Sequence, residues 1–148
     1  MAGEVFTDTN VLVYSRDSAE PEKHRKARAW MTHLWTTRRG RLSYQVLQEF
    51  YVTVTEKLDP GLDRESARRD ALAFAAWQPV AVDALVLGAA WKLQESYRLL
   101  WWDALIAAAA QVAGCAYLLS EDFQHGQMLG PVEVINPFRA SPERLTGR

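Results

Sequence analysis

Four carboxylic acids stand where a folded chain would bring them together. Asp8 directly follows the apolar, β-rich run Val5–Thr7, and Asp122 follows a second apolar run. Asp103 lies in the first turn of a predicted buried helix, and Glu49 lies inside another predicted helix. If the two runs are parallel strands, their carboxyl ends share one edge of a sheet, where open α/β sheets bind ligands.

Carboxylate oxygens are the ligands that Mg²⁺ and Mn²⁺ prefer, so the set predicts a site for one of these ions. Zinc favours cysteine and histidine ligands, and the sequence contains no such cluster. Bound divalent ions activate water and neutralise charge on a phosphate. From the residues alone, the chemistry is that of a metal-dependent phosphoryl hydrolase.

Each carboxylate also has a simpler structural interpretation. Asp8 is suited to a turn in which it bonds its own backbone, and Asp103 to complementing a helix dipole. Glu49 on its own fits a solvated helix residue, although it lies in a second apolar row between Val46 and Val52, which favours partial burial. Asp122 on its own fits a loop residue. The hypothesis of a site therefore depends on all four meeting at one edge of the sheet.

Other catalytic patterns are missing from the sequence. No serine lies in a G-x-S-x-G turn, and there is no glycine-rich phosphate loop. Asn10 stands where a phosphoaspartate hydrolase has its second aspartate. We expect Cys115 in the core and His125 in a loop turn. These observations favour the acidic set as the source of any activity.

The composition predicts one soluble intracellular domain. The chain has 148 residues, 49% of them hydrophobic, with a formal net charge of −1 and a single cysteine. A lone cysteine excludes an internal disulfide and fits a reducing compartment. No basic-then-apolar leader and no uninterrupted membrane-spanning run is visible, so we expect a cytoplasmic location and no membrane contact.

Apolar periodicity predicts strands alternating with helices, which is typical of a parallel sheet covered on both faces. The predicted strands are residues 5–7, 41–44, 80–82, 116–119 and 132–135. The predicted helices are residues 11–14, 21–39, 45–58, 84–97 and 101–113, with another that starts at Asp63 and buries Ala67, Ala71, Phe74 and Ala75. The fold class is therefore α/β, a three-layer α/β/α sandwich with a mainly parallel central sheet. We expect one domain over residues 1–138 and a flexible tail over residues 139–148.

Four ordered blocks resemble the PIN domain, and most closely the toxin ribonucleases of bacterial VapBC toxin–antitoxin pairs. The blocks are residues 8–14 (DTNVLVY), 45–50 (QVLQEF), 102–106 (WDALI) and 119–126 (LSEDFQHG). The similarity extends over residues 5–138. One block alone is weakly specific, but the four in this order are strongly so.

The resemblance implies a metal-dependent endoribonuclease. The family's acidic quartet, which holds one or two Mg²⁺ or Mn²⁺ ions, corresponds here to Asp8, Glu49, Asp103 and Asp122. Polar positions that steady that site correspond to Thr9 or Asn10 and to Ser120. Family members usually form homodimers, act on RNA and are blocked by a cognate antitoxin protein that threads a segment into the groove.

Two departures from the family pattern and two other functions stay open. Leu100 stands where a capping Ser or Thr is common, and the Trp101-Trp102 pair replaces smaller or tyrosine-like sequence, either as core or as a groove wall. One alternative function is a non-catalytic PIN-like module that binds RNA or protein. Another is a structure-specific DNA nuclease of related fold, although this chain is short for that class. The basic faces near residues 23–28, 38–41 and 64–69 suit either RNA contact or simple solvation.

Overall fold

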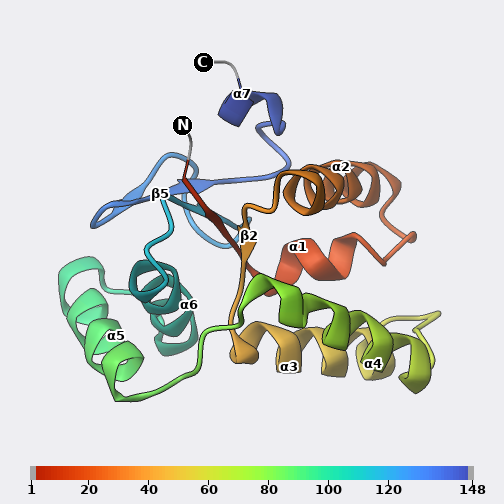
Figure 1. Ribbon diagram of the computed structural model, residues 1–148, viewed down its shortest axis with the longest axis horizontal. Coiled ribbons are helices and arrows are strands. Elements are labelled where there is room, and N and C mark those ends of the chain that lie inside the picture. The colour runs from red at the N-terminus through yellow and green to blue at the C-terminus, as the bar shows by residue number, and fades with distance from the viewer. Residues whose placement is uncertain (1–2, 147–148) are drawn as a thin grey trace.

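The computed structural model describes residues 3–146, which form a central sheet with helices on both of its faces (Figure 1). The strands follow the spatial order β2-β1-β3-β5-β4. Their bounds are β1 Val5–Thr7, β2 Gly40–Arg41, β3 Tyr117–Leu119, β4 Met128–Leu129 and β5 Val132–Ile135. Only the β4–β5 pair is antiparallel. The predicted α/β fold with a mainly parallel sheet is confirmed.

The helices connect these strands and cover the sheet. Their bounds are α1 Thr9–Tyr14, α2 Pro21–Thr37, α3 Tyr44–Val52, α4 Arg64–Ala73, α5 Ala84–Tyr97, α6 Trp101–Val112 and α7 Glu143–Thr146. Figure 1 shows α2 on one side of the sheet and the paired helices α5 and α6 on the other. Asp63 and Asp83 accept backbone N–H bonds at the starts of α4 and α5, as expected of N-caps. Among residues 3–146, no helix is both long and apolar enough to span a bilayer.

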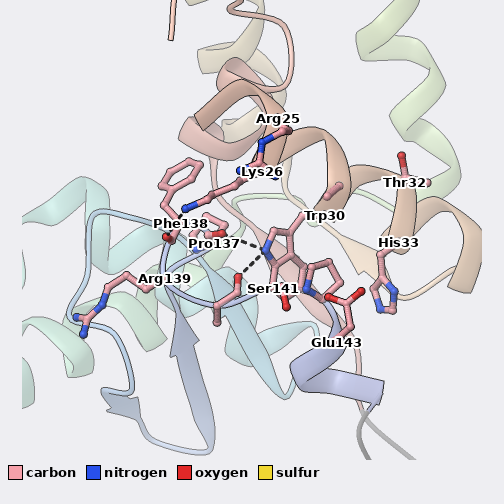
Figure 2. A pocket seen from close by; sticks show the side chains of 13 residues that line it. Arg25, Lys26, Trp30, Thr32, His33, Pro137, Phe138, Arg139, Ser141 and Glu143 are labelled. Carbon is pink, nitrogen blue, oxygen red and sulfur yellow. Dashed lines mark hydrogen bonds between the residues drawn. The ribbon is translucent and has the colours of Figure 1, made fainter. Parts of the chain in front are cut away.

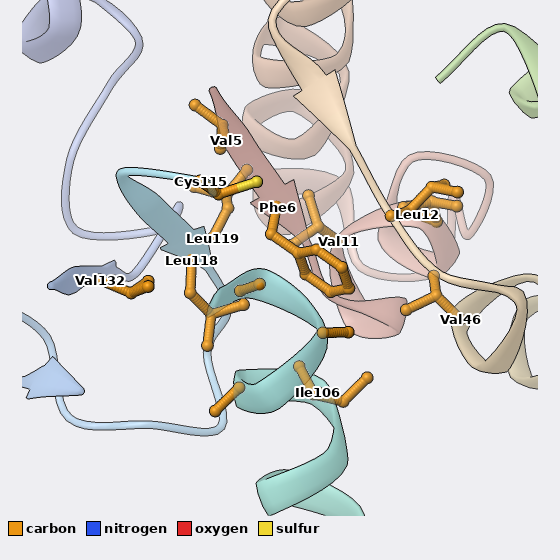
Figure 3. Packing of buried hydrophobic residues seen from close by; sticks show 14 of the residues in the cluster. Val5, Phe6, Val11, Leu12, Val46, Ile106, Cys115, Leu118, Leu119 and Val132 are labelled. Carbon is orange, nitrogen blue, oxygen red and sulfur yellow. The ribbon is translucent and has the colours of Figure 1, made fainter. Parts of the chain in front are cut away.

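The part of the core that positions the site lies between the sheet and α6. Figure 3 shows Phe6 and Leu118, from neighbouring strands, pointing toward Ile106 of this helix. Seven consecutive residues of α6, Ala104 to Ala110, are buried, which confirms the prediction of a helix enclosed by the fold. The four alanines at its centre let the backbone approach the strands closely. Burial of this apolar surface is the main force that holds α6, and therefore its first turn, in place.

From β1 and from β3 the chain adds its next strand on opposite sides of the sheet. From β1 the chain moves to β2 on one side, whereas from β3 it moves to β5 on the other. Thr7 is paired with Leu119, and the Asp8 backbone N–H donates to the carbonyl of Leu119 at 3.0 Å. Asp8 and Ser120 therefore follow the carboxyl ends of adjacent strands. This switch point is where parallel sheets leave a crevice for ligands.

Several predicted boundaries are wrong, each for a local reason. The strand predicted over residues 41–44 ends at Arg41, because Ser43 instead caps α3 by accepting a bond from the Val46 N–H. The helix predicted over residues 45–58 is α-helical only to Val52 and continues as a π-helical turn, Thr53–Lys57. The strand predicted over residues 80–82 is a single bridge between Ser43 and Val80.

The end of α2 also differs from the prediction. We expected Gly40 to stop this helix, but it ends at Thr37 with Arg38 in the left-handed conformation (φ 58°). Gly40 lies in β2, where a Cβ atom would come within 2.5 Å of the Trp77 ring. Beyond α4, Phe74–Trp77 form a 3₁₀ turn in which Phe74 and Trp77 are buried, but Ala75 is exposed, contrary to the prediction.

The segment after β5 packs against α2, although we expected a flexible tail over residues 139–148. The Trp30 indole N–H donates to the carbonyls of Pro137 (3.2 Å) and Ala140 (3.0 Å), beside a cavity of about 640 Å³ (Figure 2). Helix α7 follows, and Leu145 is buried. The predicted tail is thus a docked segment through α7, and its last two positions, 147 and 148, lie outside the described residues.

Candidate metal centre

Asp8 is the most enclosed carboxylate of the predicted site, with 4% of its surface exposed. Its Oδ1 accepts the Thr9 backbone N–H at 2.7 Å, which makes Asp8 the N-cap of α1. Its Oδ2 accepts a hydrogen bond from the Ser120 hydroxyl, also at 2.7 Å. Asp8 does bond its own turn, as the simpler interpretation required. Its second oxygen nevertheless faces the neighbouring strand end.

Asn10 and Ser120 connect Asp8 to Asp122. The Asn10 amide nitrogen donates to Asp122 Oδ2 at 3.0 Å and lies 3.4 Å from Ser120 Oγ. The Asp122 backbone N–H in turn donates to Ser120 Oγ at 3.0 Å. The two Asn10 contacts join residues more than 100 positions apart in sequence. Asp122 is therefore held against the end of β1 by polar side chains that the sequence had marked as supports.

Glu49 reaches the same place from α3. Its Oε1 accepts the Thr9 hydroxyl at 2.6 Å, and its Oε2 accepts the Gln45 amide at 3.2 Å. The side chain is partly buried, so Glu49 is not an ordinary solvated helix residue. The bond from Thr9 ties α3 to the first residue of α1, directly beside Asp8.

Asp103 completes the group from the first turn of α6, whose N-cap Leu100 offers no side-chain hydrogen bond. Burial raises the pKa of Asp103, and the charges of Asp122 and Glu49 raise it further. A position in the first turn of a helix would by itself favour the charged form and lower the pKa. Asp103 therefore lies within reach of the negative charges of Asp122 and Glu49.

Asp8 experiences the same negative neighbours. Burial raises the pKa of Asp8 from 3.8 to about 7, against the lowering effect of the bonds from Ser120 and from the Thr9 N–H. The charges of Asp122 and Glu49 raise it as well. The four predicted carboxylates thus share one electrostatic environment at the carboxyl ends of β1 and β3. Packing like charges this closely is unfavourable unless a cation joins them.

Comparison with known proteins now adds to this geometry. The sequence matches the family model of the PIN domain over residues 5–128. The chain belongs to the PIN-domain family. A comparison with curated proteins finds no match.

The PIN fold is also found in solved structures of low sequence identity. A toxin–antitoxin complex from Klebsiella pneumoniae is 18% identical over 90% of this chain and 98% of its own, with a TM-score of 0.63. The crystal structure of FitAcB from Neisseria gonorrhoeae is 18% identical over 92% and 99%, with a TM-score of 0.69. VapBC2 from Rickettsia felis, bound to a DNA fragment from its promoter, is 13% identical over 89% and 98%, with a TM-score of 0.58.

The donor set of this PIN domain fits a hard cation that keeps much of its water. In residues 3–146, no three or more His, Cys, Asp and Glu side chains are arranged to hold a metal ion together. Mg²⁺ usually takes only one or two protein carboxylates and fills its other positions with water and substrate phosphate. The oxygen donors of Asp8, Glu49, Asp103 and Asp122 are of the kind that such an ion takes.

Sequence reasoning missed one part of the site. Gln45 lies one helical turn before Glu49 and holds its carboxylate. It also lines a cavity of about 410 Å³ together with Trp102 and Leu105 of α6. The i, i+4 spacing of Gln45 and Glu49 was visible in the sequence and indicates side chains that meet. Only the fold, however, could show α6 facing them.

The basic faces near this site are partly neutralised by neighbouring acids. Lys23 pairs with Glu121 at 2.9 Å, next to Asp122. On the same helix Arg25 pairs with Glu22. These pairs reduce the cationic charge that the predicted basic surface of α2 presents to solvent.

Proposed function

We propose that this PIN domain is a metal-dependent endoribonuclease that acts as the toxin of a type II toxin–antitoxin pair. The observation that carries the proposal is the hydrogen-bonded network that connects Asp8, Glu49 and Asp122 at the switch point of the sheet. Burial, and then the charges of Asp122 and Glu49, raise the pKa of Asp8 to about 7. An arrangement that is unfavourable without a cation is what a metal-dependent phosphodiesterase requires.

In this proposal, Asp8 and Asp103 are the direct ligands of Mg²⁺ or Mn²⁺, and Glu49 and Asp122 act through water. Such an ion, when bound, neutralises charge on the phosphate and leaving oxygen and makes water more acidic. Glu49 and Asp122 would orient the attacking water and accept its proton.

Neighbouring polar side chains hold the carboxylates of Glu49 and Asp122 in place. Thr9 and Gln45 each bond one oxygen of Glu49, which leaves its carboxylate a single orientation. Asn10 fixes Asp122 at 3.0 Å. Partners of this kind commonly change metal affinity or activity 10- to 100-fold when removed, about the range we expect here.

The family and one of the solved neighbours support the choice of partners. That neighbour is a toxin–antitoxin complex from Klebsiella pneumoniae, and this fold covers 98% of its chain. We propose a cognate antitoxin protein, a homodimer and an RNA substrate, all within the cytoplasm. The surface exposes large apolar side chains at Leu72, Leu85 and Leu100, which protein contacts would bury.

Cleavage of total cellular RNA by the purified protein tests the enzymatic part. We expect discrete fragments in Mg²⁺ or Mn²⁺, and none in EDTA or with Asp8→Asn. Glu56→Gln, an exposed carboxylate beyond α3, is the matched control and should cut like wild type. Intact RNA in every sample, with RNA or antitoxin binding retained, would instead establish the non-catalytic module.

A further inference from the structure

The cavity beside the acidic cluster has a wall that the proposed chemistry does not use. It measures about 410 Å³ and is lined by Gln45, Gln48, Glu49, Val82, Trp102 and Leu105. Glu49 belongs both to this cavity and to the acidic cluster. Any group in the cavity therefore lies next to the carboxylates. The space is within the usual range for ligand sites, with mixed apolar and polar walls.

Trp102 is the apolar wall on α6. It is 64% exposed and precedes Asp103, so an accessible indole stands at the entrance to the acidic cluster. Its neighbour Trp101 is partly buried and packs against the core. Exposed aromatic side chains in nucleic-acid-binding proteins provide surfaces on which unpaired bases stack.

Gln45 is the polar wall, and only 8% of it is exposed. Its Nε2 donates to Glu49, and since a carboxylate accepts only from the NH₂ end of an amide, the orientation of this amide is defined. Its Oε1 is buried, and no described residue donates a hydrogen bond to it. A buried acceptor without a donor is unfavourable. The terminal torsion of glutamine is soft, so a small rotation can present this oxygen to a ligand in the cavity.

We propose that the cavity holds one unpaired, amino-bearing base of the RNA, next to the phosphate that is cut. Trp102 stacks on the face of the base, and Gln45 accepts a hydrogen bond from its exocyclic amino group. Adenine, cytosine and guanine supply such a group, whereas uracil does not. The inference rests on the proposed function for its substrate class and adds a base preference to it.

An apolar antitoxin side chain is the competing occupant. It would cover Trp102 and Leu105 but would leave Oε1 of Gln45 without a donor and would bury the Gln48 amide without a partner. Because burying unpaired polar groups is costly, a planar base with both an apolar face and a polar edge fits these walls better.

Binding of short single-stranded RNA homopolymers of A, C and U tests the proposal. Binding is measured by fluorescence anisotropy in Mg²⁺ with Asp8→Asn protein, so that the strands stay intact. In this background Trp102→Ala should weaken binding of A and C strands about 5- to 150-fold, the range that loss of base stacking gives. Trp102→Phe should retain most of the affinity. Trp91→Ala, which removes another exposed tryptophan on α5, is the matched control and should change nothing.

A second variant tests the polar wall. Gln45→Met should remove the preference for A and C over U. The measurement is the ratio of the affinities for A or C strands to the affinity for U strands, which should fall to about one. Thermal melting shows whether each variant is folded. If Gln45→Met does not fold, the Trp102 variants alone test the base site. Unchanged RNA binding by Trp102→Ala, or an equal loss with Trp91→Ala, would overturn the inference.

The two proposals fail in different ways. If wild type cleaves RNA with metal but Trp102→Ala binds RNA normally, the base-site proposal is wrong and the nuclease proposal stands. Base-selective binding lost in Trp102→Ala, without cleavage by wild type, would remove the nuclease alone. If Trp102→Ala binds RNA normally but fails to hold the antitoxin, the cavity belongs to the protein partner and the base site is wrong.

Discussion

Asp8→Asn should stabilise the metal-free protein above neutral pH while abolishing its activity. In the folded state the pKa of Asp8 is about 7, compared with 3.8 for an exposed carboxyl. The unfolded chain therefore releases this proton first. As pH rises from about 4 through 7, the folded state loses the stability that it has when Asp8 is protonated.

The size of this loss in folding stability follows from the difference between the folded and unfolded pKa of Asp8. A difference of about 3 pKa units at about 1.4 kcal/mol per unit gives about 4 kcal/mol for charged Asp8 above pH 7. Asparagine has no charge but accepts through only one oxygen, so either the Thr9 N–H or the Ser120 hydroxyl must find another partner, at about 1 kcal/mol. The net gain is about 3 kcal/mol at pH 8, or about 6–12 °C in Tm at this chain length.

Thermal unfolding of both proteins in EDTA at pH 4 and pH 8 measures this difference. At pH 4 the two should melt within a few degrees of each other. Asp8 is then protonated in the folded state and only about half ionised in the unfolded state, so little of the loss in stability has developed. At pH 8 the variant should melt higher, and saturating Mg²⁺ should narrow the gap by stabilising only the wild type. A variant that melts below wild type at pH 8 without metal would refute the reasoning.

Other substitutions test the neighbouring contacts. Asp103→Asn should melt at or above wild type in EDTA but should not cut RNA; a clear fall in its metal-free Tm would contradict the raised pKa of this carboxyl. Asn10→Ala should weaken Mn²⁺ binding about 10- to 100-fold by calorimetry, since Asp122 loses its amide donor; unchanged affinity would show that this contact is incidental. Trp30→Phe should lower the free energy of unfolding by about 1–3 kcal/mol in urea, because two carbonyls lose their buried donor. A loss below about 0.5 kcal/mol would mean that the segment after β5 is not docked through this indole.

The sequence was sufficient for the mainly parallel sheet and for the edge of it at which Asp8 and Ser120 lie. Short apolar runs bounded by turn residues identified β1, β3 and β5, and parallel pairing then placed Asp8 and Ser120 at one edge. The second apolar row of α3 correctly indicated that Glu49 is partly buried. These features are predictable because each depends on local periodicity and on few alternatives of chain topology.

Other features depend on contacts that no local pattern records. Two-residue β4 has too little sequence to show a period, and its antiparallel pairing with β5 fixes it. The segment with Ala140 docks because Trp30, more than 100 residues earlier, donates hydrogen bonds to it. The sequence also left Trp102 undecided between core and groove, since α6 is apolar almost all round. That indole is exposed and lines a cavity together with residues of α3.

The most direct test of the metal centre is a crystal structure of wild-type protein grown with Mn²⁺ and measured at an X-ray energy where manganese scatters anomalously. We expect an anomalous peak from a manganese ion bound to Asp8 and Asp103, with Glu49 and Asp122 contacting the ion through water. Asp8→Asn crystals should show no such peak. Manganese bound elsewhere, or a cluster without a peak at saturating Mn²⁺, would contradict the assignment of these carboxylates as the metal site.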